Sequence, residues 1–163
     1  MINCVKNIIS ILREGVRRRG YATLSDLHTI ELLLKKCPRD ARLWCIRGNL
    51  IELSEENTTY ELRDALASYK RAILIGPNYV ESYIDAGYYH FYVRDDPFRA
   101  VLYFKRAMNL ESSRQLVNIY REAQKEISER KHKKSHRGLT RRSPKESLRD
   151  KLMGKARVQK SAR

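Results

Sequence analysis

The stretch WCIRGNLI, residues 44–51, has a counterpart 39 positions further along the chain, YIDAGYYH at residues 83–90. Each stretch starts with an aromatic residue and has a glycine four positions later, at Gly48 and at Gly87. A spacing of four residues is about one turn of an α-helix, so the two residues share a helix face. The two stretches therefore indicate an internal repeat built from helices.

The segments that follow the two stretches also match each other. In both, an aromatic residue stands between two alanines, four positions after the first and three before the second. Because a proline pushes the residue before it out of the helical region, Pro77 marks the end of the first copy, and Pro38 stands ahead of that copy in the corresponding place. The residues that carry the repeat are Trp44, Gly48, Ala65, Tyr69, Ala72 and Pro77 in the first copy, and Tyr83, Gly87, Ala100, Phe104 and Ala107 in the second.

Elsewhere too, apolar residues recur at helical spacing, and no stretch alternates apolar and polar residues long enough to predict a sheet. The sequence therefore predicts an all-α fold. We expect the first helix to end at Gly20, and a second, capped by Thr23 or by residues 25–26, to end at Pro38. Further helices are expected at residues 41–53, 61–75, 80–93, 98–110 and 114–129.

The repeat residues resemble the tetratricopeptide repeat (TPR), whose signature is W-x2-L-G-x2-Y, then A-x3-F, then P. The resemblance implies antiparallel helical hairpins stacked as a short right-handed solenoid, in which glycines and alanines let the helices approach closely. It is clearest in residues 41–77 and 80–112, with residues 114–129 as a capping helix and the remaining helices completing the stack. Departures from the signature stand at Arg47, Ala86, His90 and Ser112, and in a loop, residues 54–59, with about five extra residues.

Most of the positive charge lies at the C-terminal end of the chain. The net charge is +15, and residues 130–163 hold 14 of the 34 Lys and Arg but only two of the 19 Asp and Glu. With few apolar residues to bury, this segment is expected to be a disordered tail after a helical domain of residues 1–129. A smaller basic cluster, residues 17–19, is interpreted as a solvated helix face.

The cations of the tail predict an acidic partner, and nucleic acid, anionic lipid and no partner at all stay open. The candidates for binding an anion are Arg130, Lys131, Lys133, Lys134, Arg137, Arg141 and Arg142. Because the only aromatic-like groups of the tail are His132 and His136, base stacking is hardly available, and recognition of a specific nucleic-acid sequence is not implied.

The TPR resemblance also implies a partner-binding groove, because the first helix of each hairpin lines a concave face that binds peptides or helices. The groove-facing positions are Arg42, Cys45, Asn49, Glu52, Glu81, Ile84, Asp85, Tyr88 and Tyr92. The alternative, that Ile84, Tyr88 and Tyr92 pack against an adjacent helix, stays open. The TPR subclass that grips a peptide carboxylate is not expected, because Cys45 and Asp85 stand where it needs basic or amide groups.

Several classes of function find no support in the sequence. It has no nucleophile elbow, phosphate-binding glycine loop or HExxH motif, so an enzyme, a cofactor and a metal are not expected. Three cysteines without a C-x-x-C pair are typical of a reducing compartment, and no apolar run approaches the roughly 18 residues of a membrane span. We therefore expect a cytoplasmic adaptor, scaffold or chaperone for a protein partner, or alternatively an RNA- or ribosome-associated protein anchored by its tail.

Overall fold

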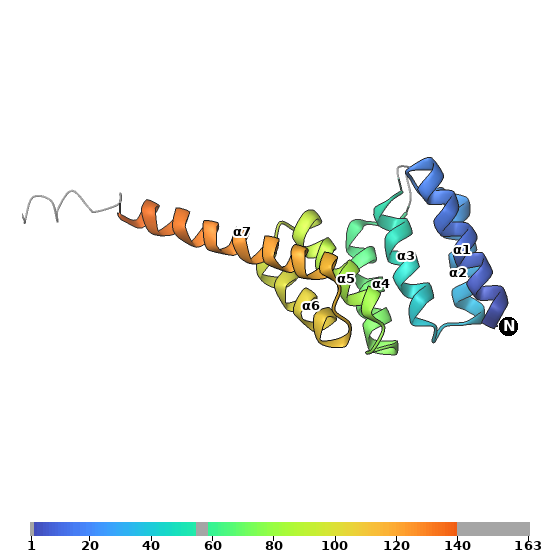
Figure 1. Cartoon of the computed structure of the whole chain (residues 1–163). Coiled ribbons are helices and arrows are strands. Elements are labelled where there is room, and N and C mark those ends of the chain that lie inside the picture. Colours follow the sequence, from blue (N-terminus) through green and yellow to red (C-terminus); the bar gives the residue numbers. More distant parts are fainter. Residues whose placement is uncertain (1, 55–58, 140–163) are drawn as a thin grey trace, which may run out of the picture. The chain divides into compact units, whose positions relative to one another are not determined.

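The computed structural model describes residues 2–54 and 59–139 of the 163-residue chain. The described residues form helices joined by short connections, with no strand among them (Figure 1). The chain divides into two units after Gln124, and the packed helices lie in the first. The elements are α1 (Ile2–Arg19), α2 (Leu24–Lys36), α3 (Ala41–Glu52), α4 (Leu62–Ile75), α5 (Val80–Tyr88), the π-helix η1 (Tyr89–Val93), α6 (Pro97–Leu110) and α7 (Arg114–Leu139).

The first helix boundaries fall where the sequence has stop and start signals. Gly20 follows α1 with a φ of 87°, a left-handed conformation that glycine adopts without strain. Thr23 and Asp26 then form a capping box at the start of α2, in which the Asp26 carboxylate accepts a hydrogen bond of 2.9 Å from the Thr23 backbone N–H. These two signals confirm the expected turn between α1 and α2.

The two repeat glycines occupy equivalent close crossings. A Cβ atom added at Gly48 would lie 2.3 Å from Cε1 of Tyr69, and one added at Gly87 would lie 2.4 Å from Cε1 of Phe104. Each aromatic ring of the second helix of a hairpin therefore packs directly on the glycine of the first helix. The predicted equivalence of the two copies is confirmed at atomic detail.

Trp44 and Tyr83, the first aromatic residues of the two copies, make equivalent hydrogen bonds. Trp44 Nε1 donates a hydrogen bond of 2.8 Å to the carbonyl oxygen of Pro38, and the Tyr83 hydroxyl donates one of 3.0 Å to the carbonyl oxygen of Pro77. In both copies the aromatic side chain thus bonds back to the proline six positions earlier. The bond ties the start of each hairpin to the turn that precedes it.

Two departures from the repeat signature have a structural reason. Arg47 replaces an apolar residue, and its guanidinium contacts Glu31 of α2 at 2.6 Å and Ser68 of α4 at 2.6 Å, so one side chain joins three helices. His90 is buried and stacks on Tyr103, with ring centroids 5.2 Å apart. Both residues thus take part in packing between helices.

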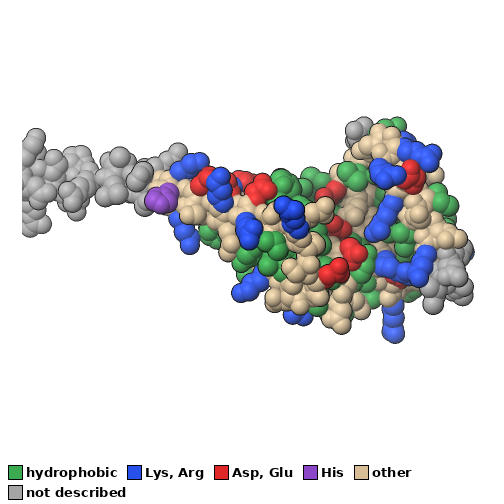
Figure 2. All heavy atoms as spheres, viewed as in Figure 1, with side chains coloured by type: hydrophobic (Ala, Val, Ile, Leu, Met, Phe, Trp, Pro, Cys, Tyr) green, Lys and Arg blue, Asp and Glu red, His purple; other side chains and the backbone are tan. Residues whose placement is uncertain are grey.

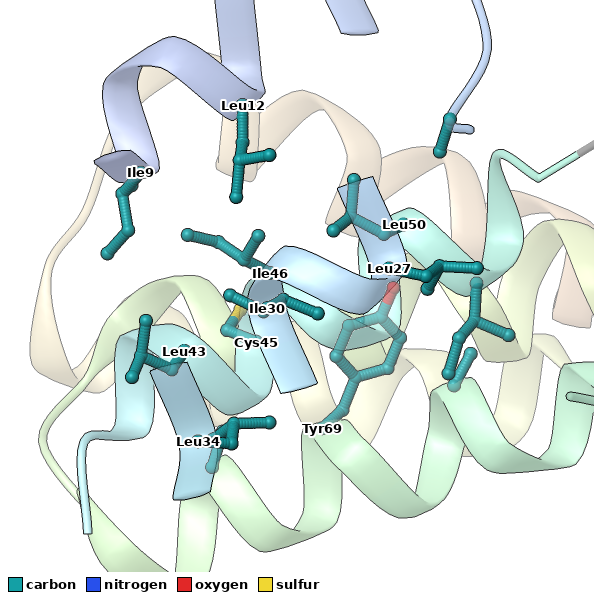
Figure 3. Close-up of a cluster of buried hydrophobic side chains, with 14 of the residues drawn as sticks. Ile9, Leu12, Leu27, Ile30, Leu34, Leu43, Cys45, Ile46, Leu50 and Tyr69 are labelled. Atoms are coloured by element: carbon teal, nitrogen blue, oxygen red, sulfur yellow. The ribbon is translucent and has the colours of Figure 1, made fainter. Parts of the chain in front are cut away.

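The buried apolar side chains form two clusters within the first unit. The first cluster joins α1, α2, α3 and α4, and Figure 3 shows Ile9 of α1, Ile30 of α2 and Ile46 of α3 turned toward one another, with the Tyr69 ring beside them. The second cluster joins α5, α6 and the first part of α7. The helices before and after the two clear repeats therefore complete the stack, as expected.

Two expected boundaries are wrong. The single helix expected at residues 80–93 is divided, because its last five residues form the π-helix η1. The helix expected to end at Glu129 continues to Leu139, so residues 130–139 are helical. Ion pairs one turn apart, such as Arg130 with Glu126 at 2.8 Å, support a solvated helix that needs no buried face.

Two expectations lie outside the described residues. They concern the extra residues of the first repeat's loop, of which residues 55–58 are not described, and the tail from residue 140 onward.

Candidate partner-binding face

The expected groove residues on α3 and α5 are mostly bonded within the fold. Asp85 of α5 accepts hydrogen bonds from the Cys45 thiol at 3.0 Å and from Asn49 Nδ2 at 3.1 Å, both on α3. Asn49 Oδ1 in turn accepts a hydrogen bond of 2.7 Å from the hydroxyl of Tyr69 on α4. These four residues form one polar network that joins three helices.

Burial raises the pKa of the Asp85 carboxyl above its usual value, and the hydrogen bonds from Cys45 and Asn49 offset part of that rise. Burial also raises the pKa of the Cys45 thiol, so the thiol stays protonated and donates its hydrogen to Asp85. The sequence interpretation treated Asp85 as a free acidic group facing a ligand. In the structure its oxygens are directed into the network.

Glu52 lies at the C-terminal end of α3, near the same network. Its carboxyl is half-buried, and its Oε1 has no hydrogen-bond partner among the described residues. Burial raises the pKa of this carboxyl to about 7, with a smaller contribution from the nearby Asp85. Glu52 therefore gains or loses a proton close to neutral pH.

The aromatic candidates divide between packing and exposure. The Tyr88 ring contacts Phe104 edge-on, with centroids 5.5 Å apart, and stacks on Tyr92 at 5.9 Å. Ile84 packs against the second apolar cluster, whereas 63% of Tyr92 is exposed. Packing against helices thus accounts for Ile84 and Tyr88, and Tyr92 remains accessible to a partner.

Two further groove candidates, Glu81 and Arg42, differ in their surroundings. Glu81 is exposed, and Arg42 is held by the carboxylate of Asp40, the residue that caps α3.

A basic cleft that the sequence interpretation missed lies between α1 and the following hairpin. Its volume is about 410 Å³, and its polar lining comprises Lys6, Ser10, Arg13, Glu14 and Arg17 of α1, Arg42 of α3, and Tyr79, which precedes α5. Figure 2 shows Lys and Arg side chains gathered at the end of the first unit where α1 lies in Figure 1. The signal in the sequence is the spacing of Lys6, Arg13 and Arg17, which recur after seven and four positions and so share one helix face.

A second, smaller cleft adjoins the first. Its volume is about 280 Å³, and it shares Arg13 and Arg17 with the basic cleft. The rest of its lining is mainly apolar and comprises Val16 of α1 with Ile46, Asn49, Leu50 and Leu53 of the α3 region. The two clefts together form a groove between α1 and α3, with a basic part and an apolar part.

The described part of the chain holds neither a membrane-spanning helix nor a cluster of metal-ligating residues. No helix there combines the length and apolar character that crossing a membrane requires. Within the same residues, His, Cys, Asp and Glu form no cluster of three or more that could hold a metal ion.

Comparison with known proteins supports the fold. No protein-family model and no curated protein matches the chain. Among solved structures, the chain is similar to the TPR2B domain of yeast Sti1 in its complex with pHsp70, with a TM-score of 0.56 and 18% sequence identity, over 72% of this chain and 94% of that chain. The chain therefore has a TPR-like fold of stacked helical hairpins, as the repeat residues indicated.

Proposed function

We propose that the chain is a non-catalytic protein–protein interaction module, an adaptor, scaffold or chaperone in the cytoplasm. It binds a peptide or helix of a partner protein on the face formed by α1, α3 and α5. The observation that carries the proposal is the groove between α1 and α3 in a TPR-like stack, because clefts between first helices are where such repeats hold extended ligands. The similar Sti1 domain was solved with pHsp70, which is compatible with this proposal.

Site-specific photo-crosslinking tests this function. A benzoylphenylalanine is introduced at Ser10 or Tyr92, which lie on the proposed face, and at Leu74 or Leu102 on α4 and α6 as matched controls. Tyr92, Leu74 and Leu102 are exposed to 63%, 71% and 67%, so accessibility does not separate the two sets.

Adducts with a defined protein are expected from Ser10 and Tyr92 only. Equal yields from all four positions, or adducts from α4 and α6 alone, would contradict the proposed face.

A second candidate function follows from the charge of the C-terminal segment. Residues 130–163 hold 14 of the 34 Lys and Arg, which favours association with RNA or the ribosome through phosphate contacts. Such an association weakens steeply as salt is raised, since bound counterions are released from the nucleic acid. Deleting residues 131–163 should abolish this association, and full retention after the deletion would eliminate the candidate.

A further inference from the structure

The basic cleft has an excess of positive charge that the fold does not neutralise. Arg17 is paired with Glu14 at 2.7 Å, and Arg42 is paired with Asp40. Lys6 and Arg13 are exposed, and no carboxylate of the described residues lies within ion-pair distance of either. Two cations on one face of α1 therefore point to an anion from outside the chain.

The wall opposite α1 does not supply that anion. Asp85 of α5 interacts electrostatically with Arg13, but it does not line the cleft, and it accepts hydrogen bonds from Cys45 and Asn49. Tyr79 lines the cleft as a neutral phenol, because burial raises its pKa to about 12. Neither of the lining residues that face α1, Arg42 and Tyr79, thus carries a negative charge beside the cations of α1.

The adjoining apolar cleft adds a second requirement for the ligand. Because Val16, Ile46 and Leu50 line it next to Arg13 and Arg17, a ligand that fills both clefts needs an apolar group close to its anionic groups. Nucleic acid does not meet this requirement, since it would place charged phosphates against apolar side chains and would find only two unpaired cations. An acidic peptide meets it with ordinary side chains.

We propose that the groove between α1 and α3 binds an acidic peptide segment of a partner protein, in which carboxylates flank an apolar side chain. The carboxylates bind Lys6 and Arg13, and the apolar side chain enters the cleft formed by Val16, Ile46 and Leu50. This inference rests on the proposed function and assigns the chemistry of the partner segment. The residues that contact the anionic groups of the partner therefore lie on α1, whereas the groove residues expected from the sequence lie on α3 and α5.

Fluorescence anisotropy with the full chain tests the inference. The probe is a fluorescein-labelled synthetic peptide with blocked termini, in which one leucine is flanked on each side by three glutamates. Two matched peptides replace the glutamates with glutamines, or the leucine with serine. Because the C-terminal cations are present in every protein variant, a difference between variants reports on the groove.

The double variant Lys6→Ala/Arg13→Ala is compared with Lys35→Ala/Arg71→Ala, which loses the same charge from exposed positions that line neither cleft. Loss of two partly exposed ion pairs should weaken peptide binding about five- to tenfold, whereas the control variant should stay within about twofold. Both matched peptides should bind more weakly to the unaltered protein than the probe does.

Several results would overturn the inference. They are equal weakening by both double variants, unchanged binding by Lys6→Ala/Arg13→Ala, and equal affinity for the leucine and serine peptides. Displacement of the probe by single-stranded RNA, with the same dependence on Lys6 and Arg13, would show a general polyanion site instead. If the peptide fails while crosslinks at Tyr92 persist, the inference is wrong and the proposed function stands.

Discussion

Replacing Gly48 with alanine should destabilise the protein because of the close crossing with Tyr69. The new Cβ would lie 2.3 Å from Cε1 of the Tyr69 ring, far inside van der Waals contact. The ring cannot move aside, since Tyr69 is only 1% exposed and its hydroxyl is bonded to Asn49 at 2.7 Å. Overpacking of a core costs about 1–3 kcal/mol, and the better helix propensity of alanine returns about 1 kcal/mol. A contact this short should cost an amount at the upper end of the overpacking range. We therefore expect a net loss of about 2 kcal/mol in the free energy of unfolding.

The same substitution at Gly15 should have the opposite sign. There the new Cβ would meet only the guanidinium of Arg19, at 3.1 Å, so the far end of that exposed side chain has to shift by a few tenths of an ångström while it keeps its ion pair with Asp26. The propensity gain should then dominate and stabilise the protein by about 0.5–1 kcal/mol. Gly15→Ala is therefore a matched control for the packing contribution at Gly48.

Urea unfolding followed by far-ultraviolet circular dichroism measures both effects as shifts of the midpoint at constant slope. A double-mutant cycle with Tyr69→Ala locates the cause, because Gly48→Ala should cease to be destabilising once the ring is absent. The reasoning is refuted if Gly48→Ala leaves the unfolding free energy unchanged or raises it. It is also refuted if the cost of Gly48→Ala is the same with and without the ring.

Two further predictions concern polar groups. The folded pKa of Glu52 is about 7, above its unfolded value of 4.5, so its contribution to stability is complete below about pH 4.5 and is lost as the pH rises through 7. As the pH rises from 5 to 8, the unfolding free energy of Glu52→Gln should therefore increase by about 1–2 kcal/mol relative to that of the unaltered protein, after allowance for solvent screening. A constant difference in unfolding free energy across that range would contradict the assignment. Tyr83→Phe removes the hydrogen bond to the Pro77 carbonyl and should lower the unfolding free energy by about 0.5–1 kcal/mol, whereas an unchanged urea midpoint would show that the bond contributes nothing.

The fold was predictable because its determinants are local in the sequence. A glycine four residues after an aromatic residue, and an aromatic residue between two alanines, each specify a packing surface without knowledge of the partner helix. The pairing of Gly48 with Tyr69 and of Gly87 with Phe104 then follows from joining two such helices as a hairpin. Steric demands of this kind are visible in residue size alone.

The site was predictable only in part, because hydrogen bonding depends on which polar groups meet in three dimensions. Asn49 and Asp85 stand at positions that face a ligand in the TPR family, yet here they bond to each other. The basic face of α1 was missed for a different reason. The consecutive run at residues 17–19 was interpreted as a solvated helix face, but Arg17 lines the cleft together with Arg13, four positions earlier along α1, and Lys6, a further seven positions earlier.

The difference between the two aromatic residues that cover the repeat glycines is explained by their neighbours. The TPR signature has a phenylalanine at this position, as in Phe104, but the first copy has Tyr69. The position of Asn49 corresponds, 39 residues later, to that of Tyr88, whose ring meets Phe104 edge-on. In the first copy the neighbour is an amide already bonded to the partly buried carboxylate of Asp85, so its oxygen needs a donor. The hydroxyl of Tyr69 supplies that donor while its ring fills the space above Gly48, and one side chain thus satisfies both the close crossing and the polar network.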